Sequence, residues 1–379
     1  MMRAFVLYMR LNMKLIHCAD LHLDSNMNSY LSDVKAKERK NELLEAFGKM
    51  VQYALDNEVY GIIIAGDLFD KKNISATARN AVMNAIINNE KLQFYYLRGN
   101  HDTTGFWGDL EELPDNLHIF ENEWTSYVLM EKNSRRVMLT GAEFDGENTA
   151  KLHNELSLKA EDLNIVVLHG QEREKSKKGA EIINLRELKN RFIDYLALGH
   201  IHSYKEAELD SRGVYCYSGC LLGRGFDECG EHGFVLINID DNDFSASREF
   251  VPITGRNLYE LEVDVTGLKD SVEISACIKE TIESCCYSKD SLVKIILIGD
   301  VDVECDINID YLNRKIEDEF YYSRIKDKTR IKIDFEMFIH DESLKGEFVR
   351  KVKEEDSLTE EDKAKVIRYG ILALRGEVI

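Results

Sequence analysis

Residues 196–204 read LALGHIHSY, an apolar run that ends at Gly199 and is followed by two histidines separated by one residue. On a helix, side chains at i and i+2 point to nearly opposite sides, whereas in an extended segment both point the same way. If this segment is extended, His200 and His202 can act at one site. An isolated pair of this kind is more often two surface histidines after a strand, so its meaning depends on whether other segments have the same form.

Four other apolar runs also end in polar residues of metal-binding types. The run 14–18 leads to Asp20 and His22, 61–66 leads to Asp67, 92–97 leads to Asn100, His101 and Asp102, and 164–170 contains His169. Ligands at the carboxyl ends of strands are expected in α/β sheets. A single aspartate after a strand is usually a turn residue or a helix cap. Five such strand ends in one chain instead predict a metal site.

The donor types restrict the metal that this site would hold. Mixed imidazole and carboxylate ligands suit Mn, Fe or Zn better than an all-oxygen site for Mg or Ca. No cysteine belongs to the set, which argues against a structural zinc site. Ligand type alone does not choose among these metals; our expectation is divalent ions, with Mn²⁺ first and Fe, Zn or Mg as alternatives.

Composition indicates an ordinary globular chain with a strongly acidic surface. The 379 residues are 44% hydrophobic and 31% charged, and the formal net charge is −20. The length favours two or more structural units. The net charge argues against a general nucleic-acid binder, since polyanions would be repelled by the whole field of the protein.

The cysteines and the N-terminus indicate a cytoplasmic protein with no membrane contact. The eight cysteines include no CxxC pair and read as reduced thiols. Residues 1–12 lack the features of a signal peptide or a membrane span. We expect them to be a non-native or disordered extension, with Met13 as the natural start.

Apolar runs alternate with helical patterns in the first two thirds of the chain. Helical spacing at 35–56 and 75–90 between the early strands predicts a partly parallel sheet. After residue 204 the strands become short and close together, which predicts a second, more antiparallel sheet in the same domain. A boundary is expected near Pro252–Asn257.

The last third predicts a small α+β domain and a helical tail. We expect strands at 258–265, 292–299 and 329–335, helices at 271–285 and 307–321, and two further helices at 343–354 and 359–374. Two helices alone are too small for a core, so this tail should dock onto another element.

The ordered motifs DxH, GD, GNHD, H and GHxH resemble the calcineurin-like metallophosphoesterase superfamily. Within it, ADLHLDS (19–25), GDLFD (66–70), LRGNHD (97–102) and LGHIH (198–202) are similar to SbcD-type DNA repair exonucleases, bacterial relatives of the nuclease subunit of the eukaryotic nuclease–ATPase repair complex. The segment SGCLLGRGFDECGEHG (218–233) looks closest to the YhaO-like branch.

The resemblance implies an α/β fold with a particular layer order and domain sequence. A four-layer α/β/β/α sandwich with two mixed sheets would form the nuclease domain over 13–255. A small α+β capping and DNA-binding domain would follow at 256–338, and a helical segment that binds a partner ATPase at 339–379.

Carried over residue by residue, the resemblance also implies two metal ions with a shared ligand. Asp20, His22, Asp67 and His202 would hold one ion, and Asp67, Asn100, His169 and His200 the other. His101 would stabilise or protonate the leaving oxygen, while Asp102 would orient His101 or cap the next turn. Arg98, Arg224 and the loop 173–178 are candidates for phosphate contacts. Asp70 stands where archaeal and eukaryotic relatives often have histidine and bacterial relatives commonly have aspartate.

The function that this resemblance implies is a metal-dependent DNA exonuclease or endonuclease acting in DNA repair with an SMC-like ATPase of the SbcC/YhaN type. A homodimer is also implied. The alternative is a metallophosphoesterase for a small phosphodiester or phosphomonoester, such as a cyclic nucleotide phosphodiesterase or a phosphatase. Because of the charge of −20, we expect the ATPase to supply much of the DNA affinity.

Overall fold

The computed structural model describes residues 12–27, 30–70, 74–102, 106–107, 112–144, 149–173, 182–333 and 335–375. The predicted extension therefore lies, apart from Asn12, outside the described residues. The chain divides into two compact units, Met1–Gly255 and Arg256–Ile379. None of the helices in the described residues combines the length and apolar character needed to cross a membrane.

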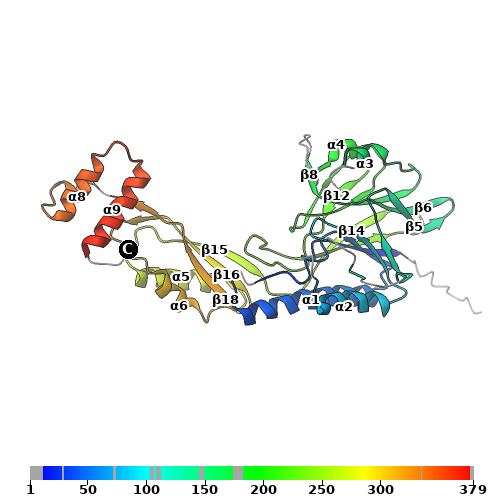
Figure 1. The fold of residues 1–379 in the computed structure, drawn as a ribbon, viewed down its shortest axis with the longest axis horizontal. Coiled ribbons are helices and arrows are strands. Elements are labelled where there is room, and N and C mark those ends of the chain that lie inside the picture. Colours follow the sequence, from blue (N-terminus) through cyan, green and yellow to red (C-terminus); the bar gives the residue numbers. More distant parts are fainter. Residues whose placement is uncertain are drawn as a thin grey trace, which may run out of the picture. The chain divides into compact units, whose positions relative to one another are not determined.

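The first unit contains two six-stranded mixed sheets (Figure 1). The first sheet has the order β14-β13-β1-β2-β3-β4, formed by Ala246–Pro252, Gly233–Ile239, Met13–Cys18, Gly61–Ala65, Gln93–Leu97 and Leu117–Ile119. The second has the order β11-β12-β10-β7-β6-β5, formed by Lys205–Glu208, Val214–Tyr217, Tyr195–Gly199, Leu163–His169, Arg135–Gly141 and Thr125–Lys132.

The two sheets pack face to face, with helices on their outer sides (Figure 1). One core cluster joins Ile63 and Leu97 of the first sheet to Val167 and Ala197 of the second. Helices α1 (Asp33–Asp56) and α2 (Ala76–Ile87) run along the outside of the first sheet, and α3 (Thr149–Glu155) and α4 (Leu185–Leu188) along the outside of the second. This is the α/β/β/α order expected from the sequence.

The strands that lead to the polar motifs are buried on both faces. Every residue of β2, β7 and β10 is buried, which explains their continuous apolar sequences. They pair in parallel with their neighbours, β2 with β1 and β3, and β10 with β7. Their carboxyl ends therefore lie at the same edge of each sheet.

The second sheet that was predicted in the same domain is present, but the strands after residue 204 do not form it by themselves. Strands β11 and β12 extend the second sheet beside β10, while β13 and β14 join β1 in the first sheet. Close spacing of short strands predicts local hairpins such as β13–β14, but the sheet that each hairpin joins depends on long-range packing that spacing does not encode.

The second unit contains a parallel three-stranded sheet, β15-β16-β18, formed by Leu258–Asp264, Leu292–Ile298 and Tyr322–Asp327. Helices α5 (Ser271–Cys285) and α6 (Ile309–Ile316) bury Ile274 and Leu312 against its strands in a separate core. The third strand of this sheet was not predicted, and the strand expected at 329–335 belongs to another sheet. Within β18 only Ile325 is a buried residue, so its apolar signal is weaker than that of the following segment.

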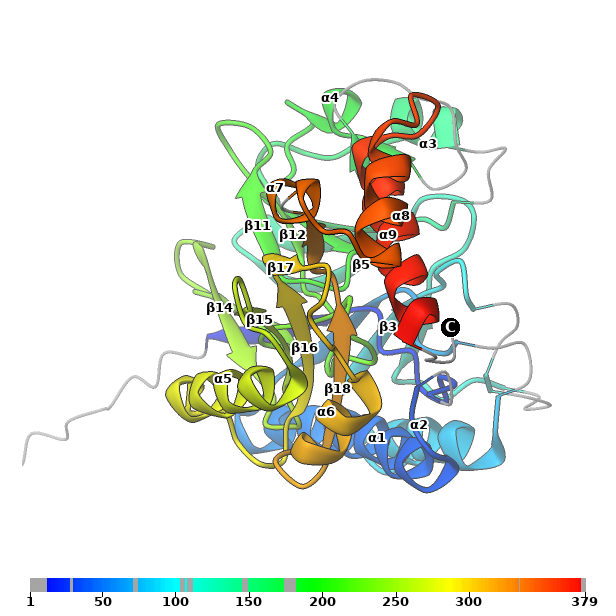
Figure 2. The ribbon, with the colours of Figure 1, turned by 90° about the vertical axis from the view of Figure 1, so that its left-hand side faces the viewer.

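The segment predicted as the third strand forms a different, smaller sheet. Strand β19 (Arg330–Lys332) pairs with β17 (Asp300–Asp302). The helical tail comprises α7 (Glu336–Ile339), α8 (Leu344–Lys353) and α9 (Glu360–Arg375), of which α8 and α9 lie side by side (Figure 2). They share a core with Ile331 of β19, so the tail docks within the second unit as expected.

Candidate metal centre

The predicted donor residues follow the carboxyl ends of β1, β2, β3, β7 and β10, and three glycines beside them leave room for close approach. A Cβ atom on Gly66 would lie 2.1 Å from His169 Nδ1, and one on Gly99 would lie 2.2 Å from Asp67 Oδ1. A Cβ atom on Gly199 would lie 2.0 Å from the carbonyl oxygen of Ala65. Glycine therefore precedes these polar residues because any side chain would displace a donor or its support.

The backbone at the site is not extended, contrary to the prediction for the DxH and HxH pairs. Asp20, His22 and His200 have φ values of 53°, 44° and 103°, in the left-handed region. Two backbone hydrogen bonds hold this conformation, from Asp20 N to Gly66 O (3.0 Å) and from His22 N to Asp67 O (2.9 Å). Non-glycine residues in such conformations are strained and concentrate at functional sites.

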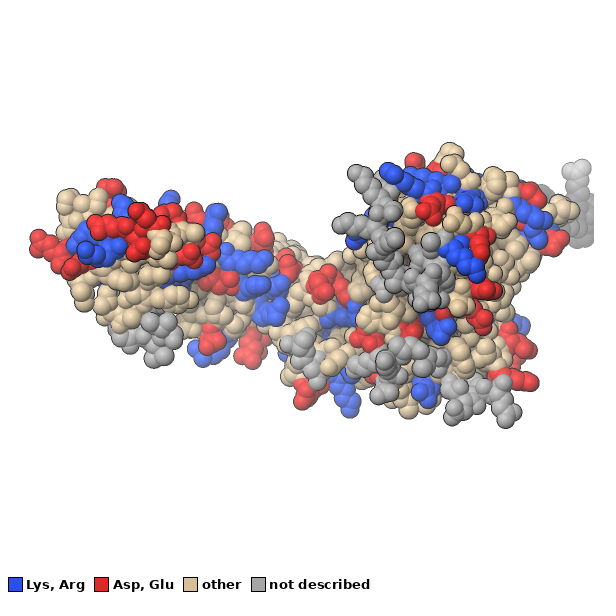
Figure 3. Space-filling view, turned by 45° about the horizontal axis from the view of Figure 1, so that its top comes forward, with Lys and Arg blue, Asp and Glu red and all other residues tan. Residues whose placement is uncertain are grey.

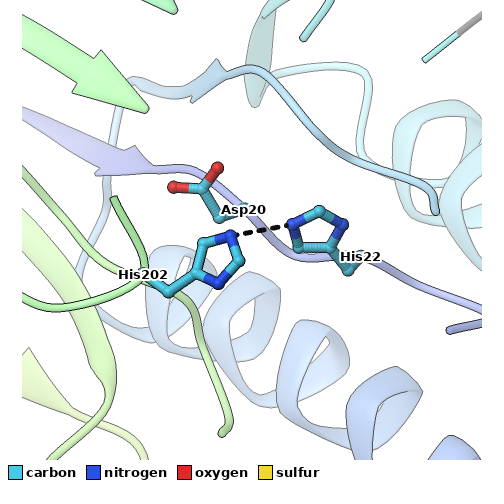
Figure 4. A group of neighbouring side chains, drawn as sticks. All are labelled: Asp20, His22 and His202. Atoms are coloured by element: carbon cyan, nitrogen blue, oxygen red, sulfur yellow. Dashed lines mark hydrogen bonds between the residues drawn. The ribbon is translucent and has the colours of Figure 1, made fainter. Parts of the chain in front are cut away.

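One group of donors consists of Asp20, His22 and His202, whose side chains converge in Figure 4. The Nε2 atoms of His22 and His202 lie 3.2 Å apart. Two imidazole nitrogens on one ion, at metal–nitrogen distances near 2.0–2.1 Å, lie about 2.9–3.4 Å apart at tetrahedral or octahedral angles. The observed separation thus fits two ligands of a shared cation.

A second group consists of Asp20, Asp67 and His169. His169 Nε2 lies 3.0 Å from Asn100 Oδ1 and 3.4 Å from Asp67 Oδ2. The opposite nitrogen, Nδ1, donates a hydrogen bond to the carbonyl oxygen of Ala65 (2.9 Å). Since that carbonyl can only accept, the Nε2 lone pair of a neutral His169 faces the other donors.

Asp67 faces both groups with the same oxygen. Its Oδ2 atom lies 3.4 Å from His169 Nε2 and 3.8 Å from His22 Nε2, while Oδ1 accepts a hydrogen bond from the backbone amide of His101 (2.8 Å). The bridging position that the resemblance implies for Asp67 matches this central place.

The predicted donor His200 contributes its backbone amide to the site. Its backbone amide donates to Asp20 Oδ1 (2.9 Å) and Oδ2 (3.0 Å). Its ring lies edge-on to that of His169, with centroids 5.5 Å apart. Within the described part of the chain, however, it belongs to none of the groups of three donor atoms that could share an ion.

Several ionisable side chains are buried close together at this site, and burial and mutual contacts shift their pKa values. Burial raises the pKa of Asp20 to about 6. Burial would also raise the pKa of Asp67, but hydrogen bonding and charge from His169 outweigh it, so that pKa lies below its usual range. For His169, burial favours the neutral ring, but Asp67 raises its pKa to about 9. Buried carboxylates and imidazoles of this kind are stabilised by a cation at their centre.

Asp70 is a site residue whose contacts were not predicted. Its Oδ1 atom lies 3.2 Å from His22 Nδ1 and 3.2 Å from His101 Nδ1. Ser25 Oγ donates to its other oxygen (3.0 Å). The resemblance had marked Asp70 as a variable position of the GDLFD motif, but it gave this residue no contact.

Asp102 connects the two loops that carry Asp67 and Asn100. Its carboxylate accepts hydrogen bonds from the backbone amides of Leu68 (3.1 Å), Phe69 (2.9 Å) and Gly99 (3.1 Å). Of the two roles predicted for it, this pattern corresponds to turn capping. The His101 side chain, by contrast, is 44% exposed.

The two predicted phosphate-contacting arginines have different surroundings. Arg98 forms a paired contact with Glu143, through Nε to Oε1 (2.8 Å) and Nη2 to Oε2 (2.7 Å). Arg224 lies between Glu228, which accepts from its Nη2 atom (2.7 Å), and Asp70, 3.6 Å from its Nη1 atom. Only Arg224 therefore reaches the donor groups. Beyond Arg173, the predicted basic loop lies outside the described residues.

Comparisons with known proteins agree with this arrangement. The calcineurin-like phosphoesterase family matches residues 13–204, slightly more than half of the chain. The uncharacterized metallophosphoesterase YhaO of Bacillus subtilis is 28% identical over 280 residues, which are 70% of this chain and 66% of YhaO. The chain thus spans slightly less than two thirds of that relative.

A second curated relative and a solved structure are also similar. The DNA double-strand break repair protein Mre11 of Sulfolobus acidocaldarius is 25% identical over 312 residues, 78% of this chain and 77% of that protein. The crystal structure of TT1561 of Thermus thermophilus covers 63% of this chain and 98% of its own, at 14% identity and a TM-score of 0.39.

Proposed function

The chain belongs to the calcineurin-like phosphoesterase family, and from that premise we propose that it is a metal-dependent nuclease that hydrolyses phosphodiester bonds in DNA. Family membership implies a hydrolase with a dinuclear metal site. The observation that supports the proposal is the meeting of carboxylate, imidazole and amide donors from five strand ends at one place.

The donor set fits two divalent ions, for which Mn²⁺ is our proposal. Asp20, His22 and His202 would hold one ion, His169 and Asn100 the other, and Asp67 would contribute to both. Ions bound there supply Lewis-acid stabilisation of the charge that develops on the phosphate oxygens. The protein fixes the donors by the short turns after the strands and by the Asp102 contacts to the backbone.

His101 is the proposed proton donor to the leaving oxygen. Its Nδ1 atom faces Asp70, so Nε2 is the nitrogen that remains to hold a proton. A positioned imidazolium can transfer such a proton to the leaving oxygen during the reaction. The exposed side chain lies where a substrate from solvent can approach it.

The preference for DNA rests on the name of one relative and on the charge pattern of the second unit. The Sulfolobus relative is named a DNA double-strand break repair protein. Strands β18 and β19 carry cations at alternate positions, Arg324 and Lys326 in the first and Arg330 and Lys332 in the second, while Ile325 and Ile331 between them pack into cores. Side chains two residues apart in a strand share a face.

The cations of β18 and β19, of which Arg330 also pairs with Asp300 (2.9 Å), support contact with a phosphate backbone on an otherwise acidic protein. Figure 3 shows Lys and Arg side chains gathered on part of the second unit among many acidic ones. A local group of cations can bind nucleic acid by displacing its counterions even where the net charge is unfavourable. The net charge of −20 still predicts weak binding by the isolated chain.

A partner ATPase is part of the same proposal. The helical tail exposes large apolar side chains, with Met337 68%, Leu344 67% and Tyr369 53% exposed. Exposed large apolar side chains are typical of protein contact surfaces. We propose that an SMC-like ATPase of the SbcC/YhaN type binds there and supplies further DNA affinity, and that the chain forms a homodimer.

The test of the proposed function is one assay with three substrates. The purified chain, freed of metal and reloaded with Mn²⁺, is given linear DNA, nicked DNA and bis-p-nitrophenyl phosphate, each with and without excess chelator. The proposal predicts chelator-sensitive cleavage of DNA. Cleavage of the small diester alone would favour the alternative substrate class of small phosphodiesters or phosphomonoesters.

A further inference from the structure

Glu228 is a buried carboxylate in the segment 218–233 that none of the roles above uses. It is 5% exposed, and its Oε1 atom lies 2.6 Å from His202 Nδ1. The same oxygen accepts a hydrogen bond from Arg224 Nη2 (2.7 Å), and Oε2 accepts one from the Arg224 backbone amide (2.7 Å). Its charge is thus matched by one partly buried arginine and directed at one imidazole.

The contact between Glu228 and His202 determines which ring nitrogen carries hydrogen. At 2.6 Å, an oxygen and a nitrogen must share a proton, since two lone pairs would repel each other. Arg224 Nη2 lies 3.2 Å from His202 Nδ1 as well, but the contact with Glu228 is shorter, at 2.6 Å, and an ionised carboxylate that already accepts from Arg224 can only accept, so the proton belongs to Nδ1 of His202. The Nε2 lone pair is then available on the side where His22 Nε2 lies 3.2 Å away.

His169 has the same arrangement with a weaker acceptor. Its Nδ1 atom donates to the neutral carbonyl of Ala65, whereas His202 donates to a carboxylate. A carboxylate behind a metal-binding histidine fixes the ring orientation and makes the opposite nitrogen a stronger ligand. Of these two histidines, His202 has the more basic Nε2 atom.

The rest of the segment holds Glu228 in place. His232 Nε2 donates to the carbonyl oxygen of Glu228 (2.8 Å). Arg39, a fully buried residue of α1, donates to the carbonyl oxygen of Gly223 (2.5 Å). Tyr30 also donates to the carbonyl oxygen of Arg224. The backbone on both sides of the carboxylate is therefore anchored to the body of the first unit.

We infer that Glu228 is a positioning residue that holds His202 with hydrogen on Nδ1 and so prepares Nε2 to bind one of the two metal ions. This rests on the metal centre of the proposed function but not on DNA as the substrate. It also assigns a purpose to the segment 218–233, which connects α1 to a metal ligand without contributing a ligand itself.

The test is a metal titration of the whole chain. Glu228→Gln keeps the shape of the side chain and removes its charge, and Glu231→Gln makes the same charge change at an exposed position three residues away. Mn²⁺ binding to the metal-free proteins is measured by calorimetry. We expect Glu228→Gln to weaken the binding of one of the two ions by about 10- to 100-fold. Glu231→Gln should bind both ions as the wild type does.

Combining Glu228→Gln with His202→Ala shows whether Glu228 acts through His202 or only stabilises the protein in general. If Glu228 acts through His202, Glu228→Gln adds no further loss of Mn²⁺ affinity to His202→Ala. An additive loss, or wild-type affinity in the single variant, overturns the inference. If the wild type itself binds no Mn²⁺, the proposed function fails instead.

A measurement without any variant covers the case in which Glu228→Gln does not fold. Long-range ¹H–¹⁵N NMR spectra of the metal-free wild type report which ring nitrogen of His202 carries hydrogen. Hydrogen on Nδ1 with an Nε2 lone pair supports the inference, and the opposite tautomer overturns it.

Discussion

His101 Nδ1 lies 3.2 Å from Oδ1 of Asp70, and this contact connects the proposed proton donor to the metal site, because the same oxygen lies 3.2 Å from His22 Nδ1. Burial alone would raise the pKa of Asp70, but His22 and Ser25 outweigh it and the pKa lies below its usual range. Asp70 is therefore an ionised carboxylate that faces both rings.

Replacing Asp70 with asparagine should reduce turnover without releasing the ions. Asparagine keeps the size of the side chain but loses the charge that orients His101, so we expect about a 10- to 100-fold lower kcat on DNA with two Mn²⁺ still bound. Asp115→Asn, an equivalent change at an exposed position, is the control. An unchanged kcat would show that Asp70 does not act through His101.

His101→Ala should bind two Mn²⁺ ions but lose most DNA cleavage, because it removes the proton donor and no predicted metal ligand. Proton transfer by a positioned side chain contributes about 10²- to 10⁴-fold. The p-nitrophenolate leaving group needs little protonation, so the loss should be much smaller with bis-p-nitrophenyl phosphate. Exposed His340→Ala is the control, and equal losses on both substrates would remove the acid role.

From the sequence alone, the identity of the donor residues was predicted better than the backbone conformation that brings them together. Strand ends were predictable because β2, β7 and β10 are buried throughout and mostly apolar, and each ends at or just before a glycine or histidine. The assumption of extended geometry was wrong, because the left-handed turns at Asp20 and His22 depend on hydrogen bonds to the loop after β2.

Asp70 and Glu228 show why the residues that support the donor histidines could not be predicted from the sequence. Each is one acidic residue among 69 in the chain, and its importance comes from a partner distant in sequence. Asp70 contacts His101, and Glu228 contacts His202 across 26 residues. The error at β18 has a similar origin, since its pairing with β16 is long-range and its own sequence is half charged.

Two glycine substitutions should have opposite effects on stability. Gly199→Ala places a methyl group 2.0 Å from a backbone oxygen that cannot rotate away, so we expect the free energy of unfolding to fall by about 1–3 kcal/mol. Gly48→Ala, on the exposed side of α1 with nothing within 4 Å, should raise it by about 0.5–1 kcal/mol. Urea unfolding of the metal-free proteins measures both, and equal effects would contradict the crowding at Gly199.

His17 should make stability depend on pH in weakly acidic solution. It is fully buried beside Tyr195 Oη (2.8 Å), and burial lowers its pKa from 6.5 to about 3. Between these values the unfolded chain binds a proton that the folded chain does not, so stability is lost as the pH falls. The slope from this group reaches about 1.4 kcal/mol per pH unit.

The His17 contribution can be isolated by difference. His17→Asn cannot be protonated and retains a polar atom near Tyr195, so the free energy of unfolding of the metal-free variant should fall less steeply between pH 6 and pH 4. Other titrating groups, including Asp20, contribute to both proteins alike. Parallel curves for the two proteins would mean that His17 is protonated in the folded state.

The exposed cations of β18 and β19 should determine how DNA binding depends on salt. Lys326 and Lys332 are exposed. Each phosphate contact contributes about 0.9 to the slope of log K against log salt concentration. Lys326→Gln with Lys332→Gln should therefore lower duplex affinity for every sequence and reduce the slope by up to about 2. The control is Lys279→Gln with Lys289→Gln, which removes two exposed charges elsewhere in the same unit and should leave the slope unchanged. Equal slopes for both double variants would show that the alternation of cations serves the fold of the second unit and not the nucleic acid.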